Sequence, residues 1–512
     1  MKRILKFLTG RLFITGMMIV AQIAWIVWFL VDVSARYHAV SALINLTAIV
    51  LAFYVITRWN NPSFHLSWVF FIMMVPIVGV PVYLIFGRPG LTRATRRRMD
   101  AVNKKIEPYL QEQPEVTERL RTQHPQAASQ SDYIWRASGQ PIYGHTDSTY
   151  YRCGEEMFPV MLEDIKKAEK FIFLEYFIWD EGEMYDALVA ELIKKAHAGV
   201  DVRLIYDDFG CISTMRPHFY RKLQKEGIKC AAFNPARPIL AIIMNHRDHR
   251  KLMVVDGKIG YTGGANIADE YINRIERFGY WKDCGIRLQG AAVRSFTVMF
   301  LEMWDFIVGG NSDYTRYMIP LSQMEQIESK GYVQPYSDTP LDDENVGENV
   351  YLNMINRATK YIYIFTPYLI PDQEMIVALC NAAKSGVDVR IVTPGIPDKK
   401  VVYQLTRSHY ARLLKKGVRI YEYTPGFLHS KCFVCDDQYA TVGTINLDYR
   451  SLYLHFECGV FLYQTPSVTQ VYEDMMTTFD VSREITYADC QRKYPLVARM
   501  AQAALRLLAP LL

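Results

Sequence analysis

Two histidines and two lysines, spaced alike in two short motifs, are the residues of this chain best suited to chemistry. Each motif has the pattern His-x-Lys-x-x-x-x-Asp, and together they comprise His249, Lys251, Asp256, His429, Lys431 and Asp436. A neutral imidazole can attack phosphorus, and a protonated one can donate a proton to a departing alkoxide. Lysine ammonium groups can hold phosphate oxygens as negative charge accumulates on them. Two such motifs could therefore exchange one phosphodiester for another.

The motifs lie inside a longer internal repeat. Residues 199–205, Gly-Val-Asp-Val-Arg-Leu-Ile, match residues 386–392, Gly-Val-Asp-Val-Arg-Ile-Val. Ten residues past each motif aspartate stands an asparagine, Asn266 in the first copy and Asn446 in the second. Two units of similar order and length indicate duplicated domains, because a solenoid needs shorter and more numerous repeats.

Each unit is expected to alternate strands and helices. Residues 171–177 and 202–206 are short runs rich in apolar, aromatic and β-branched side chains, as in buried strands. Residues 184–198 have helical spacing and end before Gly199, which predicts a helix with a glycine cap. The sequence therefore predicts an α/β fold in which helices cover a mostly buried sheet.

Each motif is itself expected to form a strand, which decides which of its side chains act together. Alternate residues of a strand share a face, so His249 and Lys251 should project to the same side. Asp256 and Asp436 fall on the other face and are expected to be structural. The same periodicity turns His246 away from His249, which argues against a metal site formed by that pair.

Several stretches around the motifs have a recognisable order. They are residues 245–251, 256–266, 269–271, 281–283, 429–431, 443–446, 448–451 and 456–457. In these stretches the chain resembles the phospholipase D superfamily and, within it, the bacterial cardiolipin synthases. Thr444 stands where that family often has serine, and His455 stands where it often has asparagine. Neither departure is expected to touch the chemistry.

The resemblance implies an architecture and a division of roles. It implies two duplicated phospholipase D-like α/β/α sandwich domains that share one active site, preceded by an N-terminal helical membrane anchor. It assigns the nucleophile to His249 and the acid and base to His429, an order that the residue types alone leave open. The groups expected to hold phosphate oxygens or to orient the histidines are Lys251, Lys431, Asn266, Asn446, Asp283 and Glu457. No metal or cofactor is expected.

The implied substrates are lipids. Phosphatidylglycerol would be both donor and acceptor, giving cardiolipin and glycerol through a covalent phosphatidyl-histidine. A hydrolytic phospholipase D, a nuclease and a non-catalytic lipid-binding scaffold are the alternatives. The apolar N-terminus argues against a nuclease, a net charge of only +5 gives no sign of nucleic-acid binding, and intact histidines in both halves argue against a scaffold. Other donors, acyl-chain preference and oligomeric state stay open.

Three uncharged apolar runs open the chain, at residues 12–31, 39–57 and 66–86. Each has about the 20 residues that a helix needs to cross a bilayer. Basic residues before the first run and at 88–105 both favour the cytoplasmic side, which requires an even number of crossings. Prolines weaken the third run as a straight helix, so we expect two crossings, with the third run re-entrant or interfacial. Three crossings are the alternative.

Together with the resemblance, which implies a bacterial source, these features predict a multi-pass protein of the plasma membrane, with cytoplasmic catalytic domains and a basic segment that favours anionic lipid. The expected divisions are an anchor at 1–87, a basic and polar linker at 88–135, a first domain at 136–334, a second linker at 335–346, a second domain at 347–490 and an amphipathic C-terminal helix at 491–512. That helix is expected to dock on the second domain or on the membrane surface.

Overall fold

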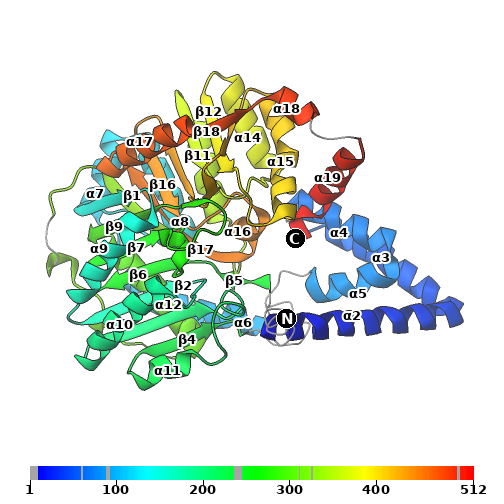
Figure 1. Cartoon of the computed structure of the whole chain (residues 1–512), viewed down its shortest axis with the longest axis horizontal. Helices are drawn as coiled ribbons and strands as arrows, with labels where there is room; N and C mark the ends of the chain where they lie inside the picture. The colour runs from blue at the N-terminus through cyan, green and yellow to red at the C-terminus, as the bar shows by residue number, and fades with distance from the viewer. Residues whose placement is uncertain are drawn as a thin grey trace.

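Two β-sheets form the body of the molecule (Figure 1), and they share one strand order except that the second has an additional edge strand, β18. The structure is a computed structural model that describes residues 10–58, 61–87, 93–235, 245–310, 312–323, 327–492 and 496–511. The first sheet runs β1 (Thr146–Tyr151), β9 (Gly285–Gly290), β7 (Ile259–Gly263), β6 (Lys251–Val255), β2 (Phe171–Tyr176), β3 (Asp201–Asp207) and β4 (Lys229–Phe233). The second runs β10 (Tyr332–Asp338), β17 (His455–Tyr463), β16 (Tyr439–Gly443), β15 (Cys432–Cys435), β11 (Tyr361–Phe365), β12 (Asp388–Pro394), β13 (Arg419–Tyr423) and β18 (Ser482–Ile485).

Helices pack on both faces of each sheet, which confirms the duplicated α/β/α architecture. In the first half these helices are α9 (Gly154–Lys166), α10 (Glu183–His197), α11 (Tyr220–Lys225) and α12 (Val293–Val308). In the second half they are α13 (Val346–Arg357), α14 (Gln373–Lys384), α15 (Lys400–Leu414), α16 (Tyr449–Tyr453) and α17 (Pro466–Asp480). The strands expected at 171–177 and 202–206 are β2 and β3, and the helix expected at 184–198 is α10.

One apolar cluster joins the two halves. It contains Phe173 and Val254 from the first sheet and Val442 and Val460 from the second, all of them fully buried. Burying such side chains contributes about 1.5–3 kcal/mol each. The halves therefore share a core, and this core holds the two motif strands, β6 and β15, in fixed positions relative to each other.

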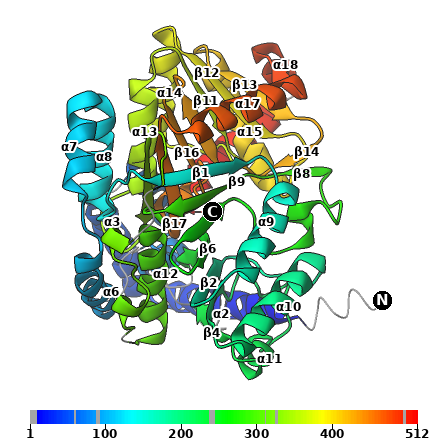
Figure 2. The ribbon, with the colours of Figure 1, turned by 90° about the vertical axis from the view of Figure 1, so that its left-hand side faces the viewer.

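The segments expected to be linkers belong to the body instead. Residues 93–138 form α6 (Arg93–Ile106), the short helix η1 (Glu107–Tyr109), α7 (Pro114–Gln123) and α8 (Pro125–Ser138). Met99 and Val102 enter the shared core, and α8 packs on α13 of the second half (Figure 2). Residues 335–338, expected to begin the second linker, lie in β10, which pairs with β17 along its whole length.

The N-terminal helices form a hairpin that projects from one side of the body (Figure 1). α2 (Arg11–Arg36) and α3 (His38–Ile56) are long and apolar enough to cross a membrane. The third apolar run is broken at Val75 into α4 (Pro62–Met74) and α5 (Pro76–Phe86), because Pro76 cannot continue the preceding helix. The body-facing end of α2 is tied to the first half by an ion pair from Arg11 to Asp208 at 2.9 Å.

The C-terminal helix lies between the second half and the anchor. α18 (Tyr487–Arg492) is followed by α19 (Leu496–Leu508) and the short helix η6 (Ala509–Leu511). Arg506 donates to the carbonyl of Ser408 in α15, and the hydroxyl of Ser67 in α4 donates to the carbonyl of Leu507. Of the two docking surfaces expected for this helix, the structure shows contacts with the second half, and the same helix also joins the body to the anchor.

Candidate active site

Two short strand pairs bring the motif histidines to the boundary between the halves. β5 (Arg247–Asp248) pairs in parallel with β17 of the second half, and β14 (Gly426–Leu428) pairs with β8 (Tyr280–Lys282) of the first half. The backbone N–H of His249 then donates to Phe456 at 2.9 Å, and that of His429 donates to Lys282 at 2.7 Å. Each motif is therefore held by the half of the molecule to which it does not belong.

The exchange places each histidine against a carboxylate from the other half. Nδ1 of His249 lies 2.9 Å from Oε1 of Glu457, and Nδ1 of His429 lies 2.8 Å from Oδ2 of Asp283. Both carboxylates are fully buried. A buried carboxylate accepts the Nδ1 proton and so fixes the tautomer, which leaves Nε2 of each ring as the reactive nitrogen.

The two carboxylates are held differently. The hydroxyl of Thr444 donates to Glu457. At the matching position of the first half stands Gly264, where an added Cβ would lie 2.0 Å from Oδ1 of Asp283. The Asp283 carboxylate instead receives the backbone N–H of Cys284 at 2.9 Å and the indole N–H of Trp281 at 3.3 Å.

Both motif lysines are buried beside the histidines. Lys251 and Lys431 are no more than 1% exposed, and each ammonium donates to the carbonyl oxygen of its own motif histidine. Burial lowers the pKa of Lys251 to about 8 and that of Lys431 to about 7. An anionic phosphate would oppose this effect and favour the charged ammonium. The site is thus poised to take up an anion.

The same environment favours the neutral form of both histidines. Burial lowers the pKa of His249 well below its usual value, and the charges of Lys251 and Lys431 lower it further. Burial and Lys431 lower the pKa of His429 to about 4, although Asp283 opposes them. A neutral imidazole is the form that can act as a nucleophile.

The motif aspartates point away from this cluster and hold backbone turns. Asp256 accepts the backbone N–H groups of residues 169–171 at 2.7–2.8 Å, and Asp436 accepts those of residues 359–361 at 2.7–2.9 Å. Both have a positive φ, near 52° and 54°. They join the end of each motif strand to the start of its neighbour, as expected for structural residues.

The two asparagines are not equivalent. Oδ1 of Asn266 accepts the backbone N–H of Ile178 at 3.0 Å, and Nδ2 donates to the hydroxyl of Tyr271 at 2.7 Å. Oδ1 of Asn446 is buried and has no hydrogen-bond partner among the described residues. The geometry therefore supports a role in orienting a phosphate oxygen more directly for Asn266, whose amide is held in place, than for Asn446.

Aromatic rings and a third histidine complete the site, and none of them was assigned a role in it from the sequence. Phe177 packs edge-on against His249 at 5.1 Å, and Trp281 lies 5.3 Å from the ring of His429. His455, expected to lie away from the chemistry, has its ring 5.4 Å from that of His249 and its Nδ1 3.7 Å from Glu457. Its position as the first residue of β17, directly before Phe456 and Glu457, was the only available signal.

Comparison with known proteins agrees with this geometry. The family profile described as "Cardiolipin synthase, PLD-like domain" matches residues 161–281 and 351–479, and the one described as "Phospholipase_D-nuclease N-terminal" matches residues 46–88. A cardiolipin synthase of Geobacillus kaustophilus is 35% identical over 92% of this chain and 93% of its own length. Cardiolipin synthase 1 of Bacillus anthracis is 32% identical over 98% of this chain and 99% of its own.

Two further relatives extend the comparison. An uncharacterized protein of Streptococcus mutans is 44% identical over 87% of this chain and 96% of its own length. The crystal structure of phosphatidylserine synthase from Haemophilus influenzae superimposes with a TM-score of 0.57 at 16% identity, covering 75% of this chain and all of the other. At that identity the likeness concerns the fold.

The duplicated fold and the paired motifs define a member of the phospholipase D superfamily. Within it, the chain belongs to the cardiolipin synthase family. It is a phosphatidyltransferase, and its apolar N-terminal helices fit a membrane protein.

Proposed function

We propose that this phosphatidyltransferase makes cardiolipin and glycerol from two molecules of phosphatidylglycerol through a phosphatidyl group carried on His249. The observation that carries the proposal is the pair of histidine–carboxylate contacts made across the two halves, His249 with Glu457 and His429 with Asp283. Two imidazoles of fixed tautomer can divide nucleophilic attack and proton transfer between them.

In the first step, Nε2 of His249 attacks the phosphorus of the donor lipid. A P–N bond forms while the bond from phosphorus to the oxygen of the headgroup glycerol breaks, and His429 donates its proton to that oxygen. Lys251 and Lys431 hold the non-bridging oxygens, and an N–H of Asn266 orients one of them. Free glycerol leaves.

The protonated form of His429 depends on the substrate. The pKa of His429 is about 4, because burial and Lys431 disfavour a second positive charge. A bound phosphodiester brings a negative charge within reach of the imidazole and favours protonation. His429 is therefore protonated, and able to act as an acid, mainly when the donor lipid is bound.

In the second step, His429 is neutral and removes the proton from a glycerol hydroxyl of the second phosphatidylglycerol. That oxygen attacks phosphorus, the P–N bond breaks, and His249 is released as a neutral imidazole. Water would give phosphatidic acid instead. The aromatic rings of Phe177 and Trp281 beside the histidines help to exclude it.

The anchor would place this site at the bilayer surface. We propose two crossings, α2 and α3, with α4 and α5 at the interface. Support comes from Arg11, at the start of α2, and Asn61, just after α3, because both bond to the catalytic body, so both ends of the hairpin lie on one side. The basic residues of that side favour the cytoplasm and an anionic leaflet.

The proposal is tested by reconstituting the purified protein in phosphatidylglycerol vesicles with a chelator and no nucleotide. Lipids and released glycerol are followed by mass spectrometry. Equal amounts of cardiolipin and glycerol are expected, with both absent in His249→Ala. Phosphatidic acid as the sole lipid product would show a hydrolase instead.

A further inference from the structure

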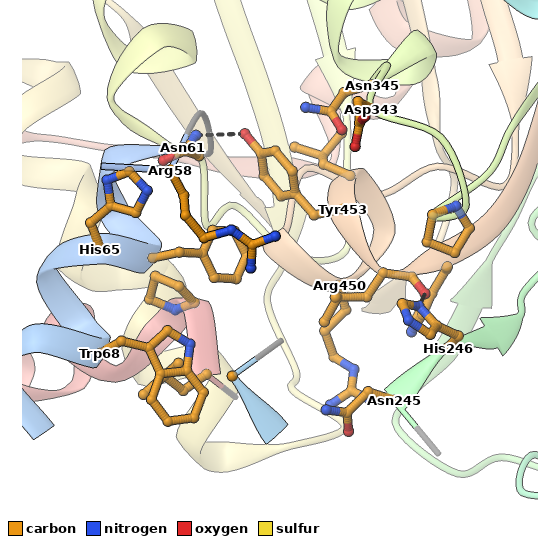
Figure 3. A pocket seen from close by; sticks show the side chains of 18 of the residues that line it. Arg58, Asn61, His65, Trp68, Asn245, His246, Asp343, Asn345, Arg450 and Tyr453 are labelled. Atoms are coloured by element: carbon orange, nitrogen blue, oxygen red, sulfur yellow. Dashed lines mark hydrogen bonds between the residues drawn. The ribbon is translucent and has the colours of Figure 1, made fainter. Parts of the chain in front are cut away.

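A cavity of about 790 Å³ lies where the anchor meets the body. Its lining comes from segments that are distant in the sequence: the helices α3 to α5 of the anchor, the C-terminal η6, and the body around α16 and the start of β17. Figure 3 shows Arg58 reaching in from the anchor while Arg450, His246 and Asn245 approach from the body.

The walls of this cavity are fixed by direct bonds between anchor and body. The amide of Asn61 donates to the hydroxyl of Tyr453 at 2.7 Å (Figure 3). It also donates to the carboxylate of Asp372 at 2.6 Å. Phe64 packs edge-on against Tyr449 and Tyr453 with ring centroids 5.6 and 5.4 Å away. These specific contacts hold the walls of the cavity in place.

One end of the cavity lies beside the contact between His249 and Glu457. His455 lines the cavity, and its Nδ1 lies 3.7 Å from Glu457, the carboxylate that holds His249. In the part of the chain that the structure describes, neither ring nitrogen of His455 has a hydrogen-bond partner. His455 therefore borders the cavity and also lies beside the nucleophile, with its ring 5.4 Å from that of His249.

The chemistry of the lining suits an anionic phospholipid. Arg58 and Arg450 present guanidinium groups, which bind phosphate with more than one hydrogen bond. Phe64, Trp68 and Leu511 supply an apolar wall continuous with the helices of the anchor.

Two of the carboxyl groups in the lining have raised pKa values. Burial and nearby Asp372 raise the pKa of Glu348 to about 8, and burial raises that of Asp338 well above its usual value. Both shifts favour the protonated, uncharged carboxyl. Arg96 is paired with Asp343 at 3.3 Å. Protonated carboxyls can also hydrogen-bond the hydroxyls of a glycerol headgroup.

We propose that this cavity binds one anionic phospholipid from the bilayer, with its phosphate between Arg58 and Arg450 and its headgroup directed at His455. Its acyl chains would lie along α3 to α5. That this lipid is the acceptor of the phosphatidyl group rests on the proposed function.

Binding is tested on the full chain, independently of turnover. Protein purified in detergent is exposed to mixed phosphatidylglycerol and phosphatidylcholine, and retained lipid is counted by native mass spectrometry. Wild type should retain phosphatidylglycerol preferentially, and Arg58→Ala should weaken retention about tenfold, as loss of a charged hydrogen bond predicts. Arg36→Ala, which removes the same charge at the far end of the hairpin, should retain lipid like wild type. Equal retention by wild type and Arg58→Ala would overturn the proposal.

A second measurement locates the lipid. Phosphatidylglycerol with a photoactivatable acyl chain should label the segment of α4 that contains Phe64 and Trp68, and His249→Ala should be labelled equally. Labelling confined to the exposed faces of α2 and α3 would overturn the proposal. Soluble glycerophosphoglycerol should compete weakly, because it lacks acyl chains; full competition would mean that the cavity binds headgroups alone and would also overturn it. Lipid retention without cardiolipin formation would contradict the proposed function and leave this site standing.

Discussion

The carboxylate of Glu457, in the second half of the chain, lies 2.9 Å from Nδ1 of His249 in the first half. The reciprocal contact, from Asp283 to His429, measures 2.8 Å. Neither histidine is oriented by its own repeat. A single half would therefore hold a histidine without its carboxylate, which explains in physical terms why the site needs both.

Replacing Glu457 by glutamine should lower kcat by about 10- to 100-fold with little change in KM, because the amide no longer fixes the tautomer of His249. Cardiolipin formation in phosphatidylglycerol vesicles measures this. Glu484→Gln removes a solvent-exposed partner of Arg419 and serves as the control. A kcat that is unchanged in Glu457→Gln would show that the contact does not orient the nucleophile.

The roles of the two histidines can be distinguished with a donor lipid that carries an activated leaving group. A phosphatidyl ester of nitrophenol needs no proton on departure, so His429→Ala should still release close to one equivalent of nitrophenol in a burst. His249→Ala should release none. Stopped-flow absorbance follows the burst. The reverse pattern would exchange the roles of nucleophile and acid.

Affinity for the anionic donor should fall as pH rises through about 7 to 8, because the pKa values of Lys431 and Lys251 lie there and only the ammonium forms bind phosphate. His249 is neutral throughout this range, since its pKa is lowered. The pH dependence of kcat/KM gives the alkaline limb. Lys431→Arg should move that limb to higher pH, because arginine stays protonated; a limb that does not move would assign it to another group.

Asp436→Asn should destabilise the fold without a specific effect on turnover. Its carboxylate accepts three backbone N–H groups through both oxygens. Asparagine keeps only one acceptor oxygen and no charge, and the loss costs about 2–4 kcal/mol in the free energy of unfolding. Thermal unfolding in detergent should show a lower Tm, while kcat per folded molecule stays near wild type. An unchanged Tm with lost activity would place this aspartate in the chemistry.

Gly264→Ala should impair the acid and base. The new Cβ would overlap Oδ1 of Asp283 at 2.0 Å and push the carboxylate away from His429. We expect a loss of about 10- to 100-fold in kcat, similar to Asp283→Asn. Gly16→Ala is the control, because nothing lies within 4 Å of that position. Full activity in Gly264→Ala would mean that the carboxylate can move without consequence.

Much of the fold could be predicted from local patterns. The apolar runs of β2 and β3 and the spacing of α10 identify these elements because each pattern belongs to one segment. The helices of region 93–138 are harder to predict, because a segment with so many charged residues resembles a linker. Its buried side chains, such as Met99, Val102 and Ile106, recur at the spacing of a helix face, and that signal would have placed α6 on the body.

The pairing inside the site could not be predicted from local patterns. β5 and β8 have two and three residues, too few to show a periodicity, yet they bring His249 to Glu457 and Asp283 to His429. His455 reaches the site through the same exchange. Contacts between residues about 150 to 200 positions apart depend on how the two sheets share a core, so no window of sequence contains them.

Trapping the covalent intermediate tests the central claim most directly. The protein is mixed with phosphatidylglycerol, quenched at alkaline pH within milliseconds to protect a phosphohistidine, and digested for mass spectrometry. The account predicts a phosphatidyl adduct on the peptide that contains His249, and its absence in His249→Ala. An adduct on His429, or rapid cardiolipin formation with no adduct on either histidine, would contradict it.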